Sequence, residues 1–121
     1  MFVFLLKSKL HVARVTDANI DYEGSLTIDM DLMDAVKILP YEKVLVSNMA
    51  NGERFETYAI PGERGSGTIC LNGATAHKGK PGDRVTIFTF CSIAAEDAAH
   101  HRPLILRLDE KNRPTGGYLH I

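Results

Sequence analysis

The chain has 121 residues, of which 45% are hydrophobic, and its formal net charge at pH 7 is -1. A chain of this length forms one domain and buries roughly two-thirds of its unfolded surface in a single core. The near-zero charge excludes a general electrostatic attraction to nucleic acid or to an anionic membrane, although a local basic site would be compatible with it.

The N-terminal apolar run, residues 2–6, is far shorter than a membrane-spanning helix, and lysines follow it instead of preceding it. Cys70 and Cys91 each lie in an apolar stretch, where an unpaired cysteine behaves as a small buried hydrophobe. These patterns predict no export signal, no disulfide and a cytoplasmic location.

Short strands between turn signals dominate the chain. The predicted strands are residues 2–6, 11–15, 25–28, 44–49, 54–60, 68–71, 84–93 and 104–108. The Asn51-Gly52 pair tolerates positive φ angles and therefore predicts a hairpin turn between the fourth and fifth of these strands.

Two short helices are expected among the strands. The Asp29 carboxylate can cap the first, which we expect to run to about Ile38 and to stop at Pro40. Residues 94–101 predict the second, and part of the polar, glycine-rich segment 109–121 is expected to be mobile. The sum is a mainly β fold, a small closed β-barrel with one or two short helices.

The segment DYEGSLTID places Ser25 directly after Gly24, at the start of a predicted strand. A serine hydroxyl can attack the preceding carbonyl, and elimination from the resulting ester followed by loss of ammonia leaves a pyruvoyl group, which is an electron sink. Glycine at position 24 should help, because the attack requires a strained backbone that a Cβ would hinder. Taken alone, a Gly-Ser pair more often marks a turn or bulge.

Four blocks between Lys9 and about Phe90 give this pair a context: KLHVARVT, DYEGSLTID, NGERFETYAIPGERGSG and NGATAH. With these blocks, in this order, the chain resembles the pyruvoyl-dependent L-aspartate α-decarboxylases, the aspartate 1-decarboxylase family. The resemblance implies a double-psi β-barrel, a homotetramer, and a single catalytic domain, 1–121, that cuts itself between Gly24 and Ser25 into fragments 1–24 and 25–121.

The resemblance also implies a covalently bound pyruvoyl group made from Ser25. Through an imine with this group, L-aspartate would be converted to β-alanine and CO2, which would supply pantothenate and coenzyme A biosynthesis. The sequence leaves open whether an accessory protein promotes maturation. No metal-binding spacing of histidines or cysteines is present, so we expect no metal cofactor.

Two residues besides Gly24 and Ser25 match family positions for self-cleavage. Thr57 and Asn72 are suited to polarise the Gly24 carbonyl as its oxygen gains charge, and we expect Thr57 to be the more important. Without the resemblance, Thr57 would read as an outward-facing β-branched strand residue.

Tyr58 matches the family's proposed proton donor, and strand alternation is compatible with one of Thr57 and Tyr58 facing the site more directly than the other. Lys9 and Arg54 match substrate-binding positions, where cations would hold a carboxylate of aspartate. The alternatives are a buried tyrosine with a satisfied hydroxyl and two ordinary surface cations.

The NGATAH block supplies Gly73, Ala74 and Thr75 as further substrate-binding residues by the same resemblance, and His11 and Tyr22 match pocket-lining positions. Three residues depart from the family pattern: Val12, Ser47 and Thr75. Thr75 matters most, because its bulk could tighten the pocket where alanine is usual.

Two alternatives stay open at this point. The chain could be a non-catalytic small barrel that binds a peptide or nucleic acid through an edge strand or a basic rim of Lys7, Lys9 and Arg14. It could also be a pyruvoyl-dependent decarboxylase that acts on a different amino acid.

Overall fold

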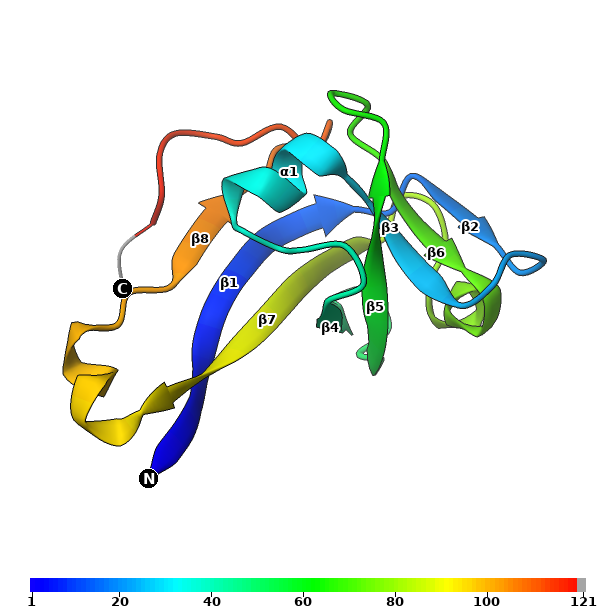
Figure 1. Cartoon of the computed structure of the whole chain (residues 1–121). Coiled ribbons are helices and arrows are strands. Elements are labelled where there is room, and N and C mark those ends of the chain that lie inside the picture. The colour runs from blue at the N-terminus through cyan, green and yellow to red at the C-terminus, as the bar shows by residue number, and fades with distance from the viewer. Residues whose placement is uncertain (120–121) are drawn as a thin grey trace.

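The computed structural model describes residues 1–119 and consists mainly of strands (Figure 1). The strands are β1 (Phe2–Arg14), β2 (Asp17–Asn19), β3 (Ser25–Asp29), β4 (Lys43–Asn48), β5 (Arg54–Gly62), β6 (Ile69–Asn72), β7 (Arg84–Ala94) and β8 (Leu104–Arg107). The helices are short: α1 (Met30–Ala35) and two 3-10 turns, η1 (Gly73–Lys78) and η2 (Ala95–His100).

The strands form one curved sheet in the order β2-β6-β3-β5-β4-β7-β1-β8. The pairs β1–β8, β2–β6 and β3–β5 are parallel, and the other neighbours are antiparallel. The predicted mainly β, barrel-like fold with short helices is thus confirmed. The expected closed barrel is nevertheless open in its hydrogen bonding, because β2 and β8 do not pair with each other within residues 1–119.

Strand β1 differs from the prediction, which had two strands at residues 2–6 and 11–15. The register against β7 shifts by one residue between Leu6 and Ser8 and again between Leu10 and Ala13, so β1 accommodates two bulges and continues. Val12, in the second bulge, has a φ of 63°. Such a conformation costs a β-branched residue about 1–3 kcal/mol, so the bulge is a strained point in the strand.

The turn between β4 and β5 forms at the predicted place. Gly52 has a φ of 77°, and its N–H donates to the Asn48 carbonyl at 2.9 Å. Positions 49–53 lie between the two strands, so the connection is longer than a two-residue hairpin turn.

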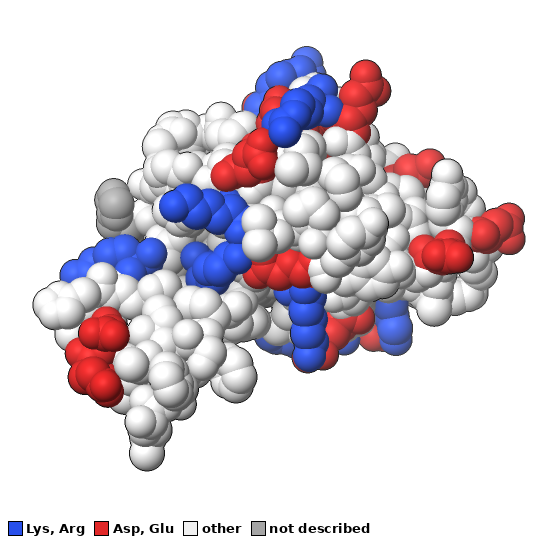
Figure 2. Space-filling model, in the orientation of Figure 1, with Lys and Arg blue, Asp and Glu red and all other residues white. Residues whose placement is uncertain are grey.

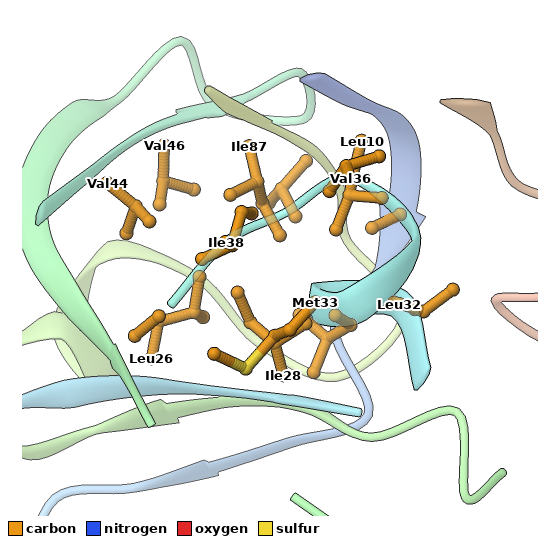
Figure 3. Close-up of a cluster of buried hydrophobic side chains, with 14 of the residues drawn as sticks. Leu10, Leu26, Ile28, Leu32, Met33, Val36, Ile38, Val44, Val46 and Ile87 are labelled. Atoms are coloured by element: carbon orange, nitrogen blue, oxygen red, sulfur yellow. The ribbon is translucent and has the colours of Figure 1, made fainter. Parts of the chain in front are cut away.

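The hydrophobic core fills the inner side of the curved sheet, and α1 covers one end of it (Figure 3). Its labelled members are Leu10, Leu26, Ile28, Leu32, Met33, Val36, Ile38, Val44, Val46 and Ile87. Side chains alternate along a strand, so the strand residues that lie between two core residues point to the opposite side of the sheet. We call that side the outer face of the sheet.

The segment after β8 folds back onto the sheet as far as the structure describes it. The buried Asn112 side chain donates to the carbonyls of Arg14 and Gly67, and the Leu119 N–H donates to Ile105. The Tyr118 hydroxyl donates to the Ala35 carbonyl at the end of α1. Residues 120–121, the last part of the predicted mobile segment, lie outside the described residues.

Acidic and basic side chains are interspersed on the face shown in Figure 2, and they lie side by side where the β5–β6 loop meets α1. There the Arg64 guanidinium contacts Asp31 at 2.9 Å and Asp34 at 2.6 Å. No helix within residues 1–119 is long and apolar enough to cross a membrane.

Asp29 fixes the far end of β3. Its carboxylate accepts from the N–H of Asp31, as the predicted helix cap, and also from those of Gly65 and Gly67. One buried carboxylate therefore joins β3, the start of α1 and the GERGSG loop. The helix ends at Ala35, short of the predicted Ile38.

Replacing Asp29 with alanine should lower the free energy of unfolding by about 2 kcal/mol, because it removes a helix cap and leaves the buried Gly67 N–H unpaired. Urea denaturation measures this change. The control is Asp31→Ala, which removes an exposed ion pair and should cost less than about 1 kcal/mol. Equal losses of unfolding free energy in the two variants would contradict the proposed role of Asp29 in connecting β3, α1 and the GERGSG loop.

Candidate active site

Ser25 is the first residue of β3, and its side chain is buried against β6. Only 2% of Ser25 and 3% of Asn72 is exposed, and the two residues are register partners. The Asn72 Nδ2 group donates to Ser25 Oγ at 2.9 Å and to Thr27 Oγ1 at 2.8 Å. Asn72 therefore holds the Ser25 hydroxyl in place next to the Gly24-Ser25 bond.

Gly73 packs directly against the peptide that precedes Ser25. It has a φ of 64°, and a Cβ on it would lie 2.7 Å from the Gly24 nitrogen and 2.8 Å from the Tyr22 carbonyl oxygen. Both the backbone conformation and the space therefore demand glycine at position 73. The contact holds the segment 22–24 against the start of η1.

Gly24 itself is less constrained than the sequence suggested. It does not have a positive φ, and a Cβ added to it would meet no described atom within 4 Å. The folded, uncut chain thus shows no steric need for glycine at position 24, and the close approach occurs at Gly73 instead.

Thr75, which stands where alanine is usual in the family, is accommodated by hydrogen bonds of its hydroxyl. Its hydroxyl donates to the Asn72 carbonyl at 2.8 Å and lies 3.4 Å from the Ser25 carbonyl oxygen. The extra side chain therefore adds a donor beside Ser25. Ala74, its neighbour on η1, is exposed.

The sheet register separates Thr57 from Tyr58. Thr57 pairs with Val44, a core residue, so it lies on the inner side. Leu26 pairs with Ala59, which places Tyr58 level with Ser25 on the outer face. No hydrogen bond joins Thr57 to residues 22–25 in the described chain, whereas Asn72 contacts Ser25 directly.

Lys9 and Arg54 also lie on the outer face, but far from each other in the sheet. Lys9 pairs with Phe88, with its Nζ 5.4 Å from the ring centroid, and Arg54 pairs with Ser47. Strands β4 and β7 separate them, and three strand spacings correspond to about 14 Å. One chain therefore does not gather both cations at Ser25.

His11 lies two residues after Lys9, beside Arg107 of β8. Its Nδ1 atom is buried and finds no hydrogen-bond partner among residues 1–119, and the same holds for Ser47 Oγ. Burial first, and then the positive charges of Lys9 and Arg107, lower the pKa of His11 below 6.5. At neutral pH the His11 imidazole is therefore uncharged, with one ring nitrogen that has no partner among residues 1–119. Like Lys9, it lies on β1, four strand positions from β3 and Ser25.

Sequence reasoning missed two polar members of the site, Thr27 and Cys70. They are register partners, directly beside the Ser25–Asn72 pair on the outer face, and the Cys70 thiol donates to Asn72 Oδ1 at 3.1 Å. The available signal was the period of two along strand β3, which puts Thr27 on the same face as Ser25.

Residues 1–115, which include every site residue described above, match the family model described as aspartate decarboxylase. The chain is thus an enzyme of the decarboxylase class, and the alternative of a non-catalytic binding module is set aside. Because the match covers nearly the whole chain, the chain belongs to the aspartate decarboxylase family.

Individual relatives agree with this assignment and confirm the resemblance seen in the sequence. The aspartate 1-decarboxylase of Thermoanaerobacter pseudethanolicus is 52% identical over 111 residues, which cover 92% of this chain and 95% of that protein. The aspartate 1-decarboxylases of Caldicellulosiruptor saccharolyticus and Shouchella clausii are each 54% identical over 113 residues. These matches cover 93% of this chain and 88% and 89% of the two proteins.

The lowered pKa of His11 predicts a pH dependence of stability. Between pH 6.5 and the lower pKa of the folded state, the unfolded chain binds a proton that the folded chain does not. The free energy of unfolding should therefore fall as the pH drops through this window, and His11→Asn should flatten the fall. Urea denaturation at several pH values tests this, with the exposed His77→Asn as control. An unchanged pH profile in the His11 variant would contradict it.

Proposed function

We propose that this decarboxylase cuts itself between Gly24 and Ser25 and converts L-aspartate to β-alanine and CO2 with the pyruvoyl group so formed. The observation that carries the proposal is the buried Ser25 hydroxyl, held by Asn72 beside the bond to be cut. The relatives named aspartate 1-decarboxylase support aspartate as the substrate. The product would enter pantothenate and coenzyme A biosynthesis in the cytoplasm.

Cleavage begins with attack of Ser25 Oγ on the Gly24 carbonyl carbon. The C–N bond breaks, the nitrogen takes the hydroxyl proton, and an ester joins Gly24 to the serine oxygen. Loss of the Ser25 Cα proton then breaks the Cβ–Oγ bond, and Oγ leaves as part of the Gly24 carboxylate. Water replaces nitrogen at the resulting dehydroalanine, and ammonia is released.

Asn72 is the residue best placed to assist these steps. Its N–H on Oγ lowers the cost of negative charge on that atom, both in the attack and in the departure of the carboxylate. The Ser25 hydroxyl itself donates toward the Glu23 carbonyl at 3.5 Å. For this role we favour Asn72 over Thr57, because Thr57 lies on the inner side of the sheet.

The residues around Ser25 fit a pyruvoyl group made from it. The ketone of such a group supplies an electron sink for the charge left when CO2 departs. The Ser25 carbonyl stays in the chain, and the Thr75 hydroxyl lies 3.4 Å from its oxygen. The single hydroxyl proton is donated to the Asn72 carbonyl at 2.8 Å, so Thr75 would have to turn to donate to Ser25. Tyr58, level with Ser25 on the outer face, is the proposed proton donor to carbon.

Binding of aspartate requires cations for its carboxylates. We assign Lys9 and Arg54 mainly to the side-chain carboxylate, because strong stabilisation of the departing carboxylate would raise the barrier. The backbone N–H groups of Gly73, Ala74 and Thr75 are proposed as further contacts. His11 and Tyr22 are proposed to line the pocket.

The separation of Lys9 from Arg54 supports a site that is completed between subunits of a homotetramer. Large apolar side chains on the sheet support association too, since Phe4 is 81% and Phe90 is 48% exposed. Together with Leu45 they line an open hollow of about 400 Å³. Apolar patches of this kind commonly mark interfaces in symmetric assemblies.

The intact mass of the denatured protein tests self-cleavage. Wild-type protein should give fragments 1–24 and 25–121, with the larger fragment carrying a pyruvoyl group at its start. Ser25→Ala lacks the nucleophile, so it should remain a single chain and form no β-alanine. A cut or active Ser25→Ala variant would contradict the mechanism.

Arg54→Leu tests the substrate assignment. Loss of a charge-assisted bond to a carboxylate should lower kcat/KM for aspartate roughly 10- to 100-fold. The matched control is Arg64→Leu, at an exposed arginine paired with Asp31 and Asp34, and it should keep wild-type kinetics. Unchanged kinetics in Arg54→Leu would count against aspartate as the substrate.

A further inference from the structure

Cys70 lies two residues before Asn72 on β6 and opposite Thr27 on β3. Alternate residues of a strand share a face, so the four side chains of Ser25, Thr27, Cys70 and Asn72 form one group on the outer face. Within this group the thiol contacts Asn72 along β6, while Asn72 reaches across to both hydroxyls of β3.

The hydrogen bonds of this group use the whole Asn72 carboxamide. Both N–H bonds are directed to hydroxyl oxygens, Ser25 Oγ and Thr27 Oγ1, and Oδ1 accepts from the Cys70 thiol at 3.1 Å. A carboxamide can turn over and exchange its oxygen and nitrogen within nearly the same volume. The partner of Oδ1 therefore helps to decide which end of the amide faces Ser25.

The two orientations have opposite electrostatic effects on Ser25. With the nitrogen toward Oγ, an N–H stabilises negative charge on that atom, including the charge it carries as it leaves with the Gly24 carboxylate. With the amide turned over, the partly negative Oδ1 would face the same atom and oppose its departure. The NH2 group would then face Sγ, which is a weak acceptor.

We propose that Cys70 is a positioning residue for self-cleavage: its thiol proton holds the Asn72 carboxamide with the nitrogen toward Ser25. This inference rests on the self-cleavage proposed above and adds a residue to it. Cys70 touches neither Ser25 nor the scissile bond through a hydrogen bond, and it acts through Asn72.

The surroundings of Cys70 keep the thiol in its donor form. Burial, and then the charge of Asp17, raise the pKa of the thiol above its ordinary value of 9.0. The group is therefore protonated at neutral pH. A serine at position 70 would supply a hydroxyl donor of similar reach, whereas alanine or valine would supply none.

The test follows the rate of self-cleavage in full-length chains made by cell-free translation, with the cut fraction measured by denaturing mass spectrometry. Loss of one neutral hydrogen bond corresponds to a roughly 2- to 10-fold slower cut in Cys70→Ala. Cys70→Val should be slowed similarly. It controls for lost packing, because valine lacks the thiol donor but packs well in a strand. Cys70→Ser should cut within about 2-fold of wild type.

Two measurements separate positioning from general structural damage. Cys91→Ala removes the other thiol, which contacts the Leu5 carbonyl on β1, and should leave the rate unchanged. The alanine and serine variants at position 70 should have similar melting temperatures. A difference in their cleavage rates would then not be caused by a difference in stability.

Wild-type rates in Cys70→Ala and Cys70→Val would overturn the inference and leave the proposed function standing. A Cys70→Ser variant as slow as Cys70→Ala would overturn it too, because the donated proton would then not matter. A wild-type chain that decarboxylates aspartate without being cut would overturn the proposed self-cleavage, and the role of Cys70 with it.

Discussion

The Asn72 carboxamide spans β3 and β6 and satisfies two hydroxyls on the opposite strand at once. If the carboxamide were lost, the hydroxyl oxygens of Ser25 and Thr27 would lose the N–H groups that donate to them. Each buried oxygen left without a donor would cost about 1–3 kcal/mol. The same contact determines where the serine oxygen lies relative to the Gly24 carbonyl. Strand pairing and the proposed chemistry therefore depend on one side chain, and a change at position 72 would affect both.

Strand β3 is held at both of its ends. At the first end, Asn72 fixes Ser25 and Gly73 presses on the peptide of Gly24. At the other end, the Asp29 carboxylate joins the strand to α1 and to the β5–β6 loop. A strand anchored in this way keeps its position whether or not a covalent bond precedes it, which suits the cleavage that we propose before the strand's first residue.

Local chemistry made part of this structure predictable. The Asp29 cap and the turn at Gly52 depend on single residues with strong preferences, and both were found where expected. The continuous β1 was missed because Lys7, Ser8 and Lys9 interrupt the apolar pattern between the two predicted strands. The bulge at Val12 was missed because valine normally avoids its positive φ. The three-residue β2 carries too little alternation to be recognised. The separation of Lys9 from the rest of the site depends on strand order, which no local pattern encodes.

A cut after Gly24 would leave β1 and β2 on a separate peptide, although β1 lies between β7 and β8 in the interior of the sheet. The mature fold would then be an assembly of two polypeptides held by strand pairing and the shared core. Once such a protein has unfolded, its recovery requires two molecules to meet, so the rate of refolding would depend on concentration. Dilution of the denatured protein would make inactivation effectively irreversible, whereas the uncut precursor could refold as a single chain.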